Sequence, residues 1–152
     1  MLAPLLHPDR CLVIAGDADV EKVFDRVAEM ASEASGVGNV PQVRAALHDQ
    51  EAKRSTVTPE GVAFPHALLY AAKRAAAVPV VAPAGLRLPG AVATATILFF
   101  LVGSSGDPWA HIRTLARLSR CVVRAESRTR LLESRTPAAA IEVLLKEDAR
   151  HG

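Results

Sequence analysis

The sequence has few aromatic residues, few cysteines and almost no excess of charge. Phe, Trp and Tyr make up 4% of its 152 residues, so the core must be built mainly from aliphatic side chains. The two cysteines, Cys11 and Cys121, lie far apart and lack the paired spacing of a metal site, which favours two buried thiols in a reducing compartment. Lys and Arg outnumber Asp and Glu by only 18 to 16, which argues against a nucleic-acid-binding surface.

A signal peptide and a membrane-spanning run are also missing. The N-terminus has no basic segment followed by a long apolar one, so we expect a cytoplasmic protein without membrane insertion. Residues 88–106 carry no charge, but only residues 91–102 are strongly apolar, and a span needs about 20 apolar residues. Such a run is typical of a strand that is buried on both faces of a sheet.

Half of the residues are apolar and 22% are charged, as expected for one folded domain spanning residues 1–152. Its charged tail from Glu147 onward is expected to fray over about the last five residues. Strands are predicted for residues 11–15, 62–64, 78–81 and 91–102, with a helical turn within residues 67–77 and a loop over residues 83–90.

Helices are predicted to begin after Asp17 or Asp19, at Pro41, after Asp107, near Ser127 and after Thr136, because capping residues and N-terminal prolines precede apolar residues at helical spacing. Apolar positions including Ile112, Leu115 and Leu118 are predicted to form the buried face of the third helix. This order of elements predicts an α/β fold with a mixed, mostly buried sheet and helices on both of its faces.

Two of the five histidines lie where a predicted strand or helix meets a loop. His66 follows strand 62–64 and the rigid Pro65, a position suited to a nucleophilic imidazole. His111 lies in the first turn of the helix that follows Asp107, where free backbone N–H groups favour an anion. The remaining three histidines, two of them near the termini, are expected at the surface.

Both segments resemble one known family. The run STVTPEGVAFPH, residues 55–66, resembles the active-site segment of enzyme IIA domains of the mannitol/fructose type of the sugar phosphotransferase system, which the nitrogen-regulatory IIA proteins share. The family also has a second histidine at the start of a helix after a long apolar strand, as His111 has here. The resemblance covers most of the chain.

The resemblance implies a phosphotransferase. His66 would accept a phosphoryl group from a phosphohistidine carrier protein and pass it to a IIB component or keep it as a regulatory mark. His111 would orient His66 or hold the phosphoryl oxygens, and Ser55 and Thr56 would support the site. The resemblance implies no metal and no other cofactor.

The sequence departs from the family at the position of an arginine. The family has an Arg-Glu pair shortly before Ser-Thr, and here Gln50-Glu51 stands in its place. Arg54 would then supply the missing guanidinium from another direction. This departure leaves a second hypothesis, a regulatory binding module that controls a partner protein by contact without efficient phosphotransfer. A third, a metal hydrolase using His66 and His111, lacks acidic ligands at a recognisable spacing.

Overall fold

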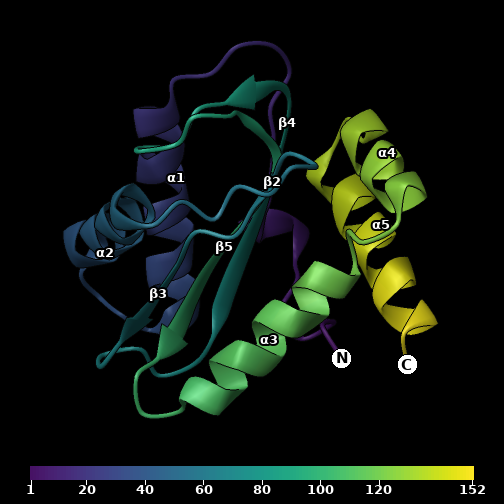
Figure 1. Cartoon of the computed structure of the whole chain (residues 1–152). Helices are drawn as coiled ribbons and strands as arrows, with labels where there is room; N and C mark the ends of the chain where they lie inside the picture. Colours follow the sequence, from purple (N-terminus) through teal and green to yellow (C-terminus); the bar gives the residue numbers. More distant parts are fainter.

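The computed structural model describes residues 1–152, and its centre is a mixed five-stranded sheet (Figure 1). The two long strands, β4 (Ala76–Leu86) and β5 (Ala95–Ser104), run antiparallel. The short strand β1 (Leu12–Val13) lies parallel to β4, while β2 (Val62–Ala63) and β3 (His66–Leu69) lie parallel to successive parts of β5. The fold class predicted from the sequence is confirmed.

Helices cover both faces of this sheet (Figure 1). The first face packs against α1 (Val20–Ser35) and α2 (Val40–Lys53). The second face packs against α3 (Pro108–Arg120), α4 (Ala125–Glu133), α5 (Pro137–Arg150) and the N-terminal segment with its short 3-10 helix η1 (Pro8–Arg10). Cys11 and Cys121 are buried as free thiols on this second face, and burial raises the pKa of each to about 12.

The uncharged run is the central strand, and its side chains alternate between the two cores. Leu98, Phe100 and Val102 face α1 and α2, whereas Phe99 and Leu101 face the opposite core. A strand buried on both sides needs no polar alternation, which explains the continuous apolar pattern. The strand begins at Ala95 rather than at residue 91, because residues 87–94 turn the chain back antiparallel to β4.

Local capping signals locate the helix starts. Asp19, Asn39, Asp107 and Thr136 each accept a hydrogen bond from a backbone N–H in the first turn of α1, α2, α3 and α5 respectively. Gly36, with φ +81°, ends α1 in the left-handed conformation that glycine adopts readily. The predicted starts of α1, α3 and α5 are confirmed.

Two predictions for the sheet were wrong. Residues 67–77 do not form a helical turn, since residues 66–69 pair with β5 as strand β3 and β4 begins at Ala76. Residues 83–90 are not all loop, because β4 continues to Leu86 after a register shift that accommodates Pro83 and Gly85. In both segments a distant strand supplies the hydrogen bonds, so alanine content and turn residues do not decide the local structure.

Two predictions for the helices were also wrong. Ile112 is exposed rather than part of the buried face of α3. The charged tail does not fray from Glu147, since α5 continues to Arg150 and both Glu147 and Asp148 are buried. Asp148 accepts a hydrogen bond from the backbone N–H of Leu2 at 2.7 Å and pairs with Arg117 at 3.2 Å, so the tail is tied to the rest of the domain.

None of the helices is both long enough and apolar enough to cross a membrane.

Candidate functional site

His66 is fixed by the backbone on its N-terminal side. It begins β3 immediately after the buried Pro65, and its Nδ1 lies 2.6 Å from the carbonyl oxygen of Phe64. A carbonyl oxygen only accepts hydrogen bonds, so this contact requires the proton on Nδ1. The ring nitrogen left with a lone pair is therefore Nε2, and His66 is partly exposed.

His111 lies beside His66. The two ring centroids are 5.2 Å apart and the ring planes are inclined by 46°. The segment that joins β5 to α3 makes this approach possible, because β3 pairs with the end of β5 and His111 lies in the first turn of the helix that follows. The structure thus brings together the two histidines that the sequence singled out.

The ring of His111 is buried and neutral. Its side chain sits against Gly103 of β5, and neither ring nitrogen has a hydrogen-bond partner. Burial, and to a smaller extent the nearby His66, together lower the pKa of His111 from 6.5 to about 4. At neutral pH the ring keeps one N–H donor with no acceptor, which is a costly arrangement for a buried group unless a ligand supplies the acceptor.

A hydrogen-bonded chain from α2 positions the segment that leads to His66. The buried carboxylate of Glu51 accepts hydrogen bonds from the backbone N–H and from the hydroxyl of Thr56, both at 2.9 Å. The Thr56 hydroxyl oxygen in turn accepts the backbone N–H of Phe64 at 2.8 Å. Because the carbonyl of Phe64 holds the ring of His66, Glu51 and Thr56 orient the imidazole without touching it.

A cleft of about 460 Å³ opens between α2 and β3, and both histidines line it. The polar groups on the α2 wall are Asp49, Gln50 and Lys53. Lys53 is the one Lys or Arg of the lining, and sequence reasoning missed it. Helical spacing could have indicated it, because Lys53 lies three residues after Gln50 and residues three apart lie on the same face of a helix.

Two predicted supporting residues lie away from this cleft. Arg54 is exposed at the C-terminal end of α2, where its backbone N–H donates to Gln50, and it does not line the cleft. Ser55 is also exposed, and its hydroxyl accepts the backbone N–H of Val57 at 3.3 Å. The structure therefore connects Thr56 to the site indirectly and connects neither Arg54 nor Ser55 to it.

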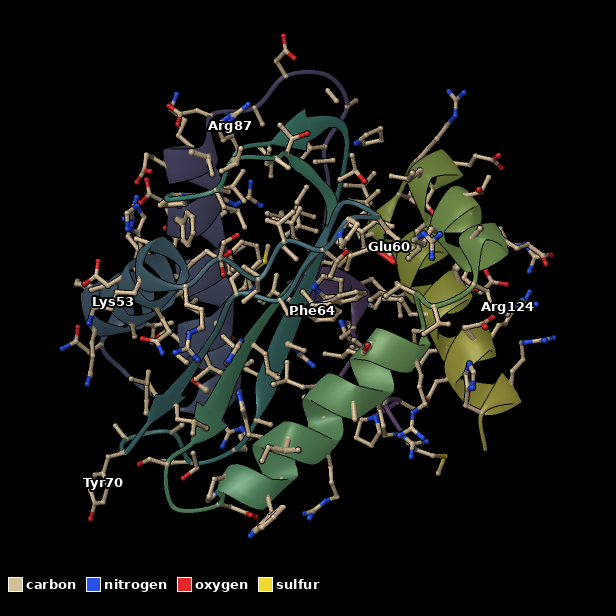
Figure 2. The ribbon with its side chains drawn as sticks, viewed as in Figure 1. Lys53, Glu60, Phe64, Tyr70, Arg87 and Arg124 are labelled. Carbon is tan, nitrogen blue, oxygen red and sulfur yellow. The ribbon has the colours of Figure 1, made fainter.

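The two segments that carry the histidines also carry exposed apolar side chains. Trp109 and Ile112 lie on either side of His111 in α3, and Leu68 lines the cleft. Tyr70, at the end of the segment that carries His66, is 94% exposed and extends away from the ribbon, whereas Phe64 at its start stacks on Phe99 within the domain (Figure 2). Of these exposed apolar groups Leu68 lines the cleft, and the others lie in the same two segments of the chain as the histidines.

No group of three or more His, Cys, Asp or Glu side chains that could hold a metal ion occurs in the chain.

Comparison with known proteins gives a family match over almost the whole chain. Residues 9–147 match the family model described as phosphoenolpyruvate-dependent sugar phosphotransferase system, EIIA 2. A curated relative, the PTS system fructose-specific EIIABC component of Bacillus subtilis, is 26% identical over an alignment of 134 residues that covers 84% of this chain. The match spans only 20% of that protein's length.

Two solved structures have the same fold. The nitrogen regulatory protein IIA-Ntr of Neisseria meningitidis superposes with a TM-score of 0.74 at 18% identity, covering 94% of this chain and 98% of that one. Enzyme IIA mannitol in its complex with phosphorylated enzyme IIB mannitol, from Escherichia coli, gives a TM-score of 0.75 at 18% identity, covering 93% and 97%.

Proposed function

The chain belongs to the EIIA 2 family of the phosphoenolpyruvate-dependent sugar phosphotransferase system, and from this premise we propose that it carries a phosphoryl group on Nε2 of His66. The donor is a phosphohistidine carrier protein. The acceptor is a IIB-type component or, in a regulatory setting, no further protein. A IIB-type acceptor is supported by the similar fold of the IIA mannitol domain that was solved with phosphorylated IIB mannitol.

The hydrogen bond from Nδ1 of His66 to the carbonyl of Phe64 carries the proposal. It leaves Nε2 as a neutral nucleophile, so no proton has to be removed before attack. The lone pair of Nε2 forms the new N–P bond while the N–P bond of the donor breaks and its electron pair returns to the donor imidazole. The positive charge that develops on the His66 ring is stabilised at Nδ1–H by the carbonyl oxygen 2.6 Å away.

His111 complements the phosphoryl oxygens. A buried ring with a pKa of about 4 is neutral, so it does not repel the imidazolium that forms on His66. Its unpartnered N–H donates to a phosphoryl oxygen during transfer, which supplies the acceptor that the free protein lacks. The α2 wall of the cleft has one positive group, Lys53, and one negative group, Asp49, so its formal charges balance.

Labelling with a phosphorylated carrier protein tests the proposal. The wild-type chain is expected to take up one acid-labile, base-stable phosphate, and His66→Ala is expected to take up none. His48→Ala is the matched control, because His48 is a partly exposed histidine on α2 that does not line the cleft. Full labelling of His66→Ala would overturn the assignment of the nucleophile.

The regulatory binding module stays a second candidate because of Gln50. This neutral amide lines the cleft where the resemblance implies an arginine, so the anion is held by fewer charged donors. The two candidates differ in one outcome. A wild-type chain that takes up no phosphate, together with His66→Ala that still controls its partner, would favour contact alone.

A further inference from the structure

Two cavities adjoin where the N-terminal segment meets α1 and α3. Their volumes are about 410 and about 510 Å³, and they share Pro4, Leu5, Arg74 and Ala75. Neither shares a lining residue with the cleft at His66. We call this pair of cavities the arginine groove, because its charged wall is formed mainly by Arg10, Arg74, Arg113 and Arg117.

The arginine groove has more positive groups than partners for them. The larger cavity is lined by Arg74, Arg113 and Arg117 and by no acidic residue, and the smaller adds Arg10 with Asp9 and Glu33. Of the four guanidinium groups only that of Arg117 forms an ion pair, with Asp148 at 3.2 Å.

The charged cavity between α4 and α5 is a useful contrast. It is about 660 Å³ in volume and is lined by basic and acidic residues in comparable number. There the cations are paired, as Arg124 is with Glu147 at 2.9 Å and Arg130 with Glu126 at 2.7 Å. The basic residues of the α4–α5 cavity all form ion pairs, whereas three of the four arginines of the groove form none.

Two buried donors in the groove residues have no acceptor. Five buried side-chain polar atoms in the chain are without a hydrogen-bond partner, and two of them are the Nε atoms of Arg10 and Arg117. A buried guanidinium N–H without an acceptor is destabilising, and such a group calls for an ordered ligand or water. Arg10 lines the smaller cavity and Arg117 the larger one, so each cavity has one such donor among its lining residues, and an anion would supply the acceptor.

We propose that the arginine groove binds a small phosphate monoester. A guanidinium group donates two parallel N–H hydrogen bonds to two oxygens of one phosphate, which favours phosphate over an anion such as chloride that has no pair of oxygens. The side chains of Pro4 and Leu5, at the junction of the two cavities, provide an apolar surface for the carbon part of the ligand. The volumes are large enough for a small phosphate monoester.

Phenyl phosphate is a suitable probe, since it joins a phosphate monoester to an apolar group. Titration of the ¹⁵N-labelled chain at constant ionic strength is expected to shift the Nε–H signals of Arg10 and Arg117. The Nε–H signal of Arg130, which lies in the α4–α5 cavity, is expected to stay in place. The probe is added to about 10 mM, a concentration that detects a binding free energy of about 3 kcal/mol, and sodium chloride serves as the control. If the Arg10 and Arg117 signals shift no more with the probe than with sodium chloride, the proposal is overturned.

Arg113→Gln is the variant of choice, because Arg113 is exposed and has no ion pair whose loss would unfold the domain. Its affinity for phenyl phosphate is expected to fall at least about tenfold, whereas Arg130→Gln binds as the wild type does. Equal affinities of Arg113→Gln and wild type would contradict the assigned site. Shifts caused by a hexa-aspartate peptide but not by phenyl phosphate would overturn the small-molecule ligand in favour of an acidic protein segment.

Discussion

At the scale of single residues, Gly103 determines where His111 can lie. A Cβ added at Gly103 would come within 2.6 Å of Nδ1 of His111 and 3.1 Å of Cδ2 of Leu68. The φ of Gly103 is not positive, so alanine is allowed by the backbone and the conflict is with the imidazole. We expect Gly103→Ala to displace the ring, to cost about 1–3 kcal/mol of stability and to slow phosphorylation of His66 roughly 100-fold.

Gly106→Ala is the matched control for this substitution. Its added Cβ would meet only the Ser104 hydroxyl oxygen at 3.4 Å, an ordinary contact, and its φ is not positive either. Urea unfolding and the rate of labelling by the phosphorylated carrier measure both effects. A Gly103→Ala chain labelled as fast as Gly106→Ala would show that the position of His111 does not matter for transfer.

Acid should weaken the fold through His111. Its pKa is lowered from 6.5 in the unfolded chain to about 4 in the folded one, so between these values the unfolded chain binds the extra proton. The stability held above pH 6.5 is therefore lost as the pH falls from 6.5 to about 4, by about 3 kcal/mol at most. His111→Gln removes this titration, so its free energy of unfolding should fall less over the same interval. Parallel curves for the two chains would contradict the assignment.

The positions of the two histidines, one after a short strand and one in the first turn of a helix, were predictable from local sequence, but their surroundings were not. Pro-His after a short strand and a histidine after Asp107-Pro108 are signals within a few residues. Helical spacing places Lys53 on the same face of α2 as Gln50, but that this face lines the cleft depends on how α2 packs against β3, which no local pattern records. Arg54 was a reasonable cation by sequence distance, yet it caps α2 outside the cleft because Lys53 occupies the last helical position that faces it.

At the scale of elements, helices were predicted better than strands for a physical reason. The capping groups Asp19, Asp107 and Thr136 act within one turn, so three residues of sequence suffice to locate a helix start. Strand β3 exists because β5 offers a parallel partner, and residues 66–69 have no periodicity of their own that indicates it. The exposed Ile112 shows that an apolar side chain at helical spacing need not face the core.

The start of α3 links helix stability to the site. The Asp107 carboxylate accepts the backbone N–H of Ala110 at 3.1 Å, and the Thr136 hydroxyl does the same for Ala139 in α5. Asp107→Ala and Thr136→Ala should each cost about 1 kcal/mol of stability in urea unfolding. Only Asp107→Ala should also slow labelling of His66, because His111 lies in the turn that Asp107 caps. Equal labelling rates for the two variants would show that the capping of α3 by Asp107 does not affect phosphorylation of His66.

At the scale of the whole molecule, exposed apolar groups are few and unevenly placed. Seven large hydrophobic side chains are exposed, and four of them, Leu68, Tyr70, Trp109 and Ile112, belong to the two segments that carry His66 and His111. The single Trp and the single Tyr of the chain are both among these four. A carrier protein that delivers a phosphoryl group to Nε2 of His66 must dock close to these two segments, so we expect the four side chains to form part of that interface.

Trp109 should therefore supply much of the affinity for the carrier. It is 70% exposed, and a tryptophan covered at the centre of an interface contributes about 2 kcal/mol or more on truncation. Because Trp109 does not line the cleft, Trp109→Ala should raise the KM for the phosphorylated carrier about 30-fold and leave kcat close to the wild-type value. Val123→Ala is the control, since Val123 is exposed beyond the opposite end of α3. A kcat effect without a KM effect would instead place Trp109 among the residues that position His111, and an unchanged KM would move the docking surface away from α3.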